Sequence, residues 1–408
     1  MGNPATSKAI GLFVLVVASC SDDGVAQDGG DSTNASGTSF GDPSESGAQE
    51  SVTISTDGAT APEEGTSSDP DDESGDETGL QPADGVTVHL VPQPDTSGMQ
   101  RINFAVPLWP GALGDAALVR VSHEGSELAS WSRALALHGD GSVRSVQVQI
   151  ELAVDGEADV EVEFGVAAAT TLDAVMVEET LVVADGSAGP RVWALLPAAW
   201  LADSGVTGPQ IPASEVQGSA TAWETLCDYQ AYGIDVFLAE MGDTGSWLYD
   251  RGTAMYRGYA RTGELVPLES AYRETAIYVL GSTGSGADVQ IPVPGAADDL
   301  KYHYAQHAAI HYLLSGDDRF REYAEDVATR AHDLWGDPGY GGGADFWTER
   351  HAGFALLAYV WAEIVSDDRG DAFAGWEIEE LVEYEDDISE GGAHRGRSAL
   401  IGMVARKP

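Results

Sequence analysis

A pattern of two helices joined by a short turn recurs between residues 251 and 376, and it constrains the fold more than any other feature of the sequence. The turns lie at residues 262–264, 315–317 and 366–368, about 50 residues apart. At each turn a glycine or a small polar residue ends the first helix, and an acidic residue can begin the second. A fixed period of this size predicts an array of helical hairpins.

The two helices of each expected hairpin differ in polarity. Residues 351–365, HAGFALLAYVWAEIV, are apolar nearly all round, so we expect an inner, buried helix. Residues 319–333, RFREYAEDVATRAHD, carry more charge, so we expect the second helices to face outward. A closed ring of six hairpins would need roughly 300 residues at this period. The chain from Met241 to Pro408 holds about three hairpins, which predicts an incomplete array.

Short β-rich segments precede the helical part. Between residues 84 and 190 they are separated by the turn signals DTSG, HEGS, HGDGS and VDGEA. The segments are VTVHLV, RINFAVPL, ALVRVS, SVQVQIEL and VEVEFG. Short strands with such turns predict an antiparallel β-sandwich over residues 84–190. Residues 190–240 are less regular, although VWALLPAAWLADSG indicates a strand followed by a short helix, and GVTGPQIPASEVQGSAT indicates a loop.

The N-terminal segment shows no pattern of a folded domain. The apolar run AIGLFVLVVASC follows Lys8, is too short to span a bilayer and ends at Cys20. Its VASC ending resembles a bacterial lipobox, which predicts a lipoprotein signal peptide over residues 1–20 and lipidation of Cys20. Residues 21–80 contain 16 acidic and no basic residues. We therefore expect a disordered acidic linker over residues 21–82, and a location in the bacterial cell envelope, periplasmic or at the cell surface.

These features together predict a multidomain β and α protein, an antiparallel β-sandwich followed by an incomplete (α/α) helical-hairpin toroid. The hairpin domain is expected over residues 225–376 and an irregular tail over residues 377–408. The arrangement resembles carbohydrate-active enzymes with an (α/α) toroid, including polysaccharide lyases and six-hairpin glycoside hydrolases. The segments that carry this resemblance are YDRGTAMYRGYARTGE, YHYAQHAAIHYLLSGDDRF and FWTERHAGFALLAYVWA. INFAVPLWPGAL and HGDGSVRSVQVQIEL are similar to the leading β-domain of exo-acting rhamnogalacturonan lyase-like proteins.

Three histidines recur at intervals of four residues. If His303, His307 and His311 share one helix, they also share one face. A neighbouring pair could chelate one metal, but all three could not, because the outer two would be about 12 Å apart. The chain has no HExxH motif and no cysteine cluster, so we expect no metal and no cofactor. Two interpretations stay open: packing on an inner helix, or a polar face for catalysis or sugar binding.

The resemblance points to candidate site residues. A lyase neutralises a uronate carboxylate and removes the proton α to it. The expected catalytic residues are His303, Tyr304 and His307 for proton transfer, with Arg350 and His351 for charge neutralisation. The glycine-rich loop GDPGYGGGADFWTERH supplies the expected substrate-binding residues, Tyr340, Asp345, Trp347 and Glu349.

A glycoside hydrolase would instead need two carboxyl groups across a cleft, about 5 to 10 Å apart. Asp250, Asp345 and Glu349 are candidates for that pair. Asp250 with Arg251 also fits a helix N-cap with an ion pair, which is the simpler interpretation.

Charge and motifs narrow the partners. The net charge of −47 argues against binding nucleic acid or an anionic membrane surface through general electrostatics. No nucleophile elbow, P-loop or Rossmann fingerprint indicates another enzyme class. We expect a lipid-anchored lipoprotein whose partner is a polysaccharide or oligosaccharide. Its expected activity is that of a lyase on uronate-containing glycans, and the alternatives are a glycoside hydrolase and a non-catalytic glycan-binding protein.

Overall fold

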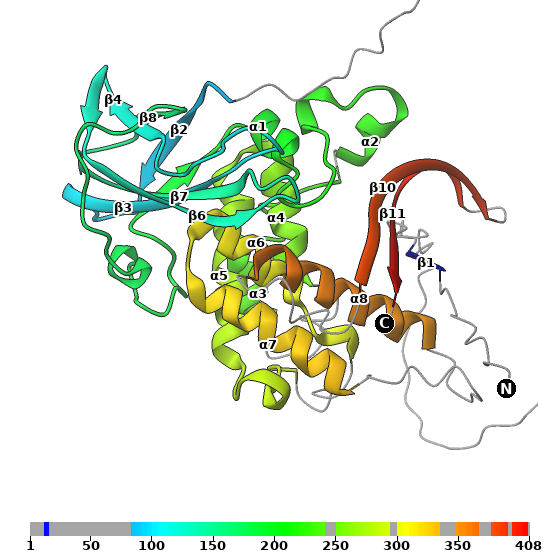
Figure 1. Ribbon diagram of the computed structural model, residues 1–408. Coiled ribbons are helices and arrows are strands. Elements are labelled where there is room, and N and C mark those ends of the chain that lie inside the picture. Colours follow the sequence, from blue (N-terminus) through cyan, green and yellow to red (C-terminus); the bar gives the residue numbers. More distant parts are fainter. Residues whose placement is uncertain are drawn as a thin grey trace, which may run out of the picture. The chain divides into compact units, whose positions relative to one another are not determined.

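The computed structural model describes residues 12–15, 83–224, 226–240, 250–293, 300–334, 348–366, 377–390 and 394–406. It combines antiparallel sheets with helices, so the prediction of a mixed β and α protein is confirmed at that level (Figure 1). Among the described helices, none is both long enough and apolar enough to cross a membrane.

One sheet has five antiparallel strands. Residues alternate in burial along β2, where Val86, Val88 and Leu90 point into the core. The predicted turns at DTSG, HEGS and VDGEA each lie between strands, and Asp95 and Gly125 have the positive φ that such turns require. In spatial order the strands are β5 (Ser126–Leu128), β4 (Val119–His123), β8 (Ala158–Phe164), β2 (Gly85–Pro92) and β9 (Val192–Leu195).

The second sheet has three antiparallel strands and is buried on both faces along its central strand. One row of that strand contains Val146, Val148 and Ile150, and the other row contains Ser145, Gln147 and Gln149. Both rows are buried, because the apolar row joins the hydrophobic core and the polar row faces a helix. The strands are, in order, β3 (Gly98–Pro107), β7 (Val143–Val154) and β6 (Ser130–Leu137).

Short helices connect the sheets to the helical part. The predicted strand and helix in VWALLPAAWLADSG are present as β9 and α1, and Gly205 ends α1 with a φ of 64°. The α-helices of this part are α1 (Ala198–Ser204), α2 (Thr221–Glu224) and α3 (Ile234–Glu240). The 3₁₀ helices among the described residues are η1 (Val177–Thr180), η2 (Ala213–Glu215), η3 (Gly218–Ala220), η5 (Gly286–Asp288) and η6 (Leu300–Tyr302).

Two of the three predicted hairpins are confirmed. The first pairs α4 (Arg251–Thr262) with α5 (Leu265–Gly281), and the second pairs α6 (Ala305–Ser315) with α7 (Asp318–Leu334). Gly263 and Gly316 end the first helix of each pair in the left-handed conformation, which glycine adopts without strain. The third hairpin contributes α8 (Thr348–Val365), but its predicted second helix falls on residues that the structure does not describe, and the strand β10 begins at Glu377.

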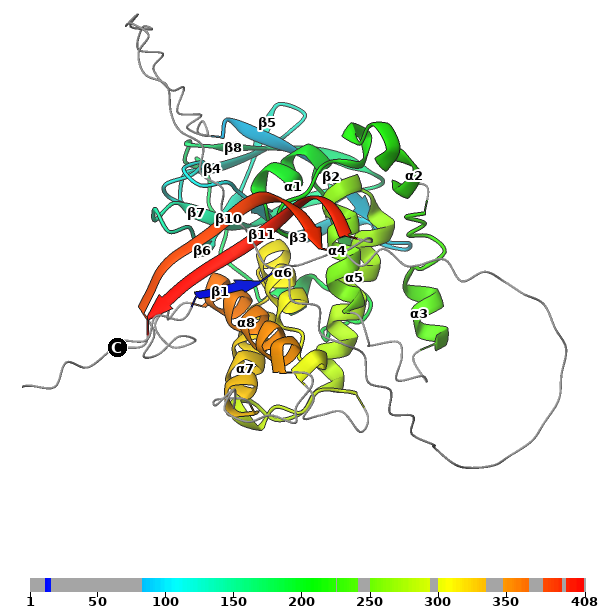
Figure 2. The same ribbon diagram turned by 90° about the vertical axis from the view of Figure 1, so that its right-hand side faces the viewer.

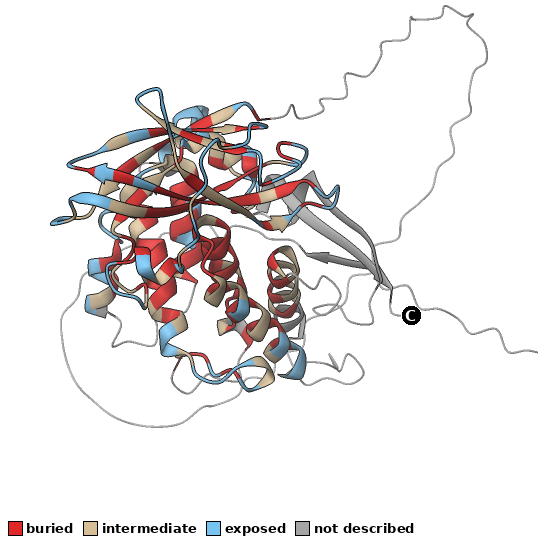
Figure 3. Cartoon of the chain, turned by 60° about the vertical axis from the view of Figure 1, so that its left-hand side comes forward, coloured by how far each residue is buried: buried red, intermediate tan, exposed pale blue. Residues whose placement is uncertain are grey.

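The burial of the helices agrees with the sequence prediction in the second hairpin but not in the first. Helix α6 is buried nearly all round, and α7 buries one face only, as expected of an inner and an outer helix (Figure 3). Helix α5 is a second helix that was expected to face outward, and that expectation is wrong. It packs against α3, α4 and α6 and also meets β9, where Tyr272 lies edge-on against Trp193.

Residues of the sheet formed by β3, β7 and β6 bind the C-terminal end of α6. The last carbonyls of a helix have no partner within the helix and must be satisfied from outside. Ser145 donates to the carbonyl of Leu313 at 2.6 Å, and Asn103 donates to that of Ser315 at 2.7 Å. The guanidinium of Arg133 donates to Gly316 O at 2.9 Å. The regions predicted as separate β and α domains therefore share one interface, and their apolar residues belong to one core cluster.

Residues after α8 do not match the predicted irregular tail. Strands β10 (Glu377–Glu390) and β11 (His394–Arg406) pair antiparallel along their length, so the prediction is wrong for the described part of this segment. Residues 382–385 of β10, VEYE, alternate apolar with acidic residues, which suits a strand. Strand β1 (Leu12–Leu15), within the predicted signal peptide, pairs with β11 (Figure 2). Cys20 and the predicted linker over residues 21–82 lie outside the described residues.

Candidate functional site

The centre of the candidate site is a contact between α6 and the start of α4. His307 Nδ1 lies 3.0 Å from Asp250 Oδ1, and both side chains are buried. Asp250 also caps α4, because Oδ1 accepts a hydrogen bond from the backbone N–H of Thr253. A carboxylate that accepts from Nδ1–H selects the tautomer in which Nε2 carries the lone pair. Asp250 therefore orients the imidazole ring of His307.

Asp250 holds an uncommon backbone conformation. Its φ of 48° and ψ of 64° are left-handed, a region that aspartate enters more readily than most residues but at an energetic cost. Such strain persists where surrounding contacts determine the conformation, and it concentrates at functional sites. Here the surrounding contacts are the N-cap bond to Thr253 and the contact with His307.

Two tyrosines border the His307 ring. The ring of Tyr278, from α5, lies edge-on with its centroid 4.8 Å from that of His307, and the ring of Tyr304 lies 6.1 Å away. Burial raises the pKa of Tyr278 well above its usual value, so its phenol stays protonated. His307 Nε2 has no hydrogen-bond partner among the described residues. The hydroxyl of Tyr278 donates to the carbonyl of Tyr302. The arrangement therefore places Nε2 of His307 beside two tyrosine rings.

These contacts also fix how the three helices run. Asp250 and Tyr256 of the α4 region meet His307 and His311 in the same order, so α4 and α6 are parallel. Tyr272 and Tyr278 of α5 meet His311 and His307, so α5 runs the opposite way. Since Asp250 precedes α4, the candidate site lies at the N-terminal ends of α4 and α6.

A second buried carboxylate lies beside Asp250. Glu274, from α5, is 1% exposed and binds the guanidinium of Arg251 through both oxygens, at 3.1 and 3.2 Å. Burial, opposed by Arg251 and reinforced by the charge of Asp250, raises the pKa of Glu274 to about 7. The Arg251 guanidinium also donates to Tyr232 O and lies over the ring of Phe237, which ties α3 to this cluster. Arg251 pairs with Glu274, whereas the sequence indicated a pair with Asp250.

The remaining histidines have different surroundings. His311 stacks on Phe320 at 3.6 Å, and its Nδ1 lies 2.8 Å from Tyr256 Oη. Burial lowers the pKa of His311 well below its usual value, so the ring is neutral and belongs to the core. His303 precedes α6, which begins at Ala305, so the three histidines do not share one helix. Within the described parts of the chain, no three His, Cys, Asp or Glu side chains are placed to hold a metal ion.

The other predicted site residues are only partly described. Arg350 and His351 belong to the first turn of α8, which contacts α6 and α7, but their side chains are not described. The expected substrate-binding residues Tyr340, Asp345 and Trp347 lie outside the described residues, and Glu349 is placed only by its backbone in α8. Their predicted roles remain predictions.

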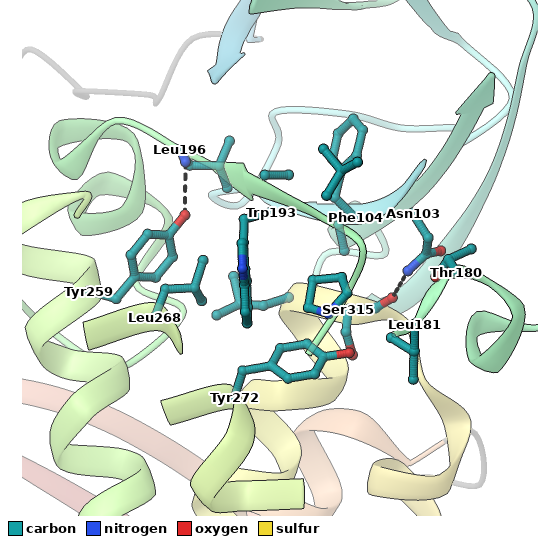
Figure 4. Close-up of a pocket in the computed structure, with 15 residues that line it drawn as sticks. Asn103, Phe104, Thr180, Leu181, Trp193, Leu196, Tyr259, Leu268, Tyr272 and Ser315 are labelled. Carbon is teal, nitrogen blue, oxygen red and sulfur yellow. Dashed lines mark hydrogen bonds between the residues drawn. The ribbon is translucent and has the colours of Figure 1, made fainter. Parts of the chain in front are cut away.

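A small pocket lies elsewhere, where the three-stranded sheet meets β9, α4, α5 and α6 (Figure 4). Four of its polar groups are engaged in two hydrogen bonds, because Leu196 N donates to Tyr259 Oη and Asn103 donates to Ser315 O. Its volume is about 30 Å³, room for about two water molecules and not for a sugar. Predicted catalytic residues are absent from its lining, which consists of Asn103, Phe104, Ala105, Thr180, Leu181, Pro190, Val192, Trp193, Ala194, Leu196, Tyr259, Leu268, Tyr272, Leu314 and Ser315.

Comparison with known proteins adds no assignment: no protein-family model, no curated protein and no solved structure matches this chain. The assignment of the candidate site therefore rests on the geometry of its own residues. Sequence reasoning missed Glu274 as a site residue. The available signal was a single carboxylate within SAYRETAIYV, a stretch otherwise rich in apolar and aromatic residues.

Proposed function

We propose that this chain is a surface-anchored, carbohydrate-active lipoprotein that cleaves uronate-containing glycans by β-elimination at His307. The observation that carries the proposal is the buried Asp250–His307 contact, with Nε2 unpartnered among the described residues and two tyrosine rings beside it. A histidine whose Nδ1 is held by a carboxylate presents Nε2 as a general base.

The residues divide the reaction as follows. His307 Nε2 removes the proton on the carbon α to the uronate carboxylate. The electron pair of that C–H bond forms the new C=C bond, and the bond from the β-carbon to the glycosidic oxygen breaks. The leaving oxygen takes a proton from a phenol, for which Tyr304 is the proposed donor because its ring lies near His307. Arg350 or His351 neutralises the carboxylate, which makes the α proton more acidic.

The architecture supports the same class of protein. Two antiparallel sheets share a core with two helical hairpins and the helix α8. We interpret this arrangement as a β-sandwich followed by an incomplete (α/α) toroid. In such a toroid the loops at one end of the inner helices border the cleft. Asp250, His303 and Tyr304 all precede inner helices, and the sequence segment from Tyr340 to Trp347 immediately precedes α8, which contains Glu349.

A second candidate function is glycoside hydrolysis, favoured by the two buried carboxyl groups at the site. Glu274 has a pKa of about 7, the value that a general acid requires near neutral pH, and its neighbour Asp250 would be the second carboxyl group. We prefer the lyase mechanism because both carboxylate oxygens of Glu274 accept hydrogen bonds from Arg251, whereas His307 Nε2 has no hydrogen-bond partner among the described residues.

The test is a screen of the full-length chain on uronate-containing and neutral polysaccharides, with two readouts. New reducing ends together with the absorbance of an unsaturated uronate support the proposal. Reducing ends without that absorbance support hydrolysis, and binding without either product supports a glycan-binding protein. The variant His307→Gln should lose about 10²- to 10⁴-fold in turnover while the fold is retained. Unchanged turnover in that variant would refute the role of His307.

A further inference from the structure

A glycine in the first turn of α4 lies directly against His307. A Cβ atom added to Gly252 would be 3.0 Å from His307 Nδ1, 3.0 Å from His307 Cβ and 2.8 Å from Thr275 Oγ1. Contacts of this length are shorter than ordinary van der Waals contact, so the neighbouring side chains would have to move. Only glycine lets the ring of His307 approach the backbone of α4 this closely.

Helix stability alone does not explain this residue. A glycine inside a helix is about 1 kcal/mol less favourable than alanine. The φ of Gly252 is not positive, so no left-handed conformation requires glycine here. A close approach of another group is the remaining physical reason for a glycine at this position.

We infer that Gly252 is a positioning residue for His307: with Asp250 two residues before it, it forms a notch that fixes the imidazole in one orientation and one tautomer. Asp250 supplies the acceptor for Nδ1–H, and Gly252 supplies the space in which Nδ1 can reach that acceptor. The catalytic part of this inference rests on the proposed function, while the notch itself does not.

Thr275 forms the other wall of the notch. The same added Cβ would meet its Oγ1 atom before it met the imidazole, so Thr275 and His307 enclose Gly252 from α5 and α6. A methyl group at residue 252 would therefore push His307 away from α4. That movement breaks the contact between Nδ1 and Asp250 and frees the ring to change tautomer.

The experiment uses full-length protein labelled with ¹⁵N-histidine and reads the side-chain resonances directly. The Nδ1–H signal of His307 is assigned by its absence in His307→Gln. We expect Gly252→Ala to lose or strongly shift this signal. The matched control is Gly258→Ala in the same helix, where an added Cβ would meet the ring of Tyr229 instead. The control should leave the His307 signal in place, and an unchanged signal in Gly252→Ala overturns the inference.

A second variant covers the case in which Gly252→Ala does not fold. Gly252→Ala combined with Thr275→Ala removes the close contact with Thr275 Oγ1 but keeps the close contacts between the added methyl group and His307. The same Nδ1–H signal is therefore expected to shift. An unshifted signal in this double variant also overturns the inference. If a glycan substrate is found, a displacement of about 1 Å should lower turnover about 10²-fold. A shifted signal without any glycan cleavage would leave the notch established and reject the proposed function.

Discussion

The pKa of Glu274 makes the stability of this protein depend on pH in a specific direction. Its folded-state pKa is about 7, against an ordinary value of 4.5, because burial penalises the charged form more than Arg251 stabilises it. Between pH 4.5 and 7 the folded state therefore binds more protons at Glu274 than the unfolded state does. Stability from this group is complete below pH 4.5 and is lost as pH rises through 7.

The magnitude follows from the size of the shift. Each pKa unit corresponds to 1.36 kcal/mol, so a shift from 4.5 to about 7 corresponds to about 3 kcal/mol. Between pH 5 and pH 8 the free energy of unfolding should fall by roughly 2 to 3 kcal/mol because of Glu274. Glu274→Gln removes the titration and keeps the shape of the side chain, so this part of the pH dependence should disappear.

The assay is urea unfolding at pH 5, 6, 7 and 8, followed by tryptophan fluorescence in the wild type and the variant. The informative quantity is the change with pH in the difference between the two proteins, because any effect of the substitution on packing shifts the variant by an amount that does not depend on pH. The control is Glu269→Gln, on the same helix, whose carboxylate pairs with Arg273 at the surface. Equal pH slopes for the wild type and Glu274→Gln would refute the reasoning.

Three further predictions concern other parts of the chain. Gly316→Ala should lower the melting temperature more than Gly205→Ala. Both glycines have a positive φ, but an added Cβ at Gly316 would be 2.2 Å from Gln147, whereas at Gly205 it meets nothing within 4 Å. Because burial keeps His311 neutral, the contribution of His311 to stability should fall as pH drops below 6.5, opposite in direction to that of Glu274, and His311→Phe should lose this contribution in the same urea assay; an unchanged pH dependence would contradict it. Cys20→Ser should abolish fatty-acid labelling of the full-length chain, and equal labelling of both proteins would reject the lipoprotein prediction.

The sequence predicted those strands and helices whose ends are marked by turn residues or by a glycine. Turn residues located most strands of both sheets, and the glycines at 263 and 316 located two helix ends. Strand β6 was missed because SWSRALAL does not alternate cleanly between polar and apolar residues. The outward placement of α5 was wrong because its surroundings are set by α3, α6 and Trp193 of β9, which come from other parts of the sequence.

The candidate site was predictable only in part for the same reason. The sequence indicated His307 and Tyr304, and it indicated Asp250 as a helix cap. It could not show that Asp250 reaches His307, because that contact depends on α4 and α6 running parallel. The role of Gly252 depends on a distance between two helices, which no spacing in the sequence encodes.

The hydrogen bonds between the sheet of β3, β7 and β6 and the C-terminal end of α6 limit how this chain can be divided into fragments. Ser145, Asn103 and Arg133 fix the C-terminal end of the helix, and His307 lies near its other end, about 12 Å along the axis from Ser315. A helix is stiff over that length, so the contacts between α6 and the strands determine where the imidazole ring of His307 lies relative to the sheet. The β part and the helical part are therefore not interchangeable modules: a helical fragment expressed alone, or one fused to foreign strands, would have no reference point for the position of His307.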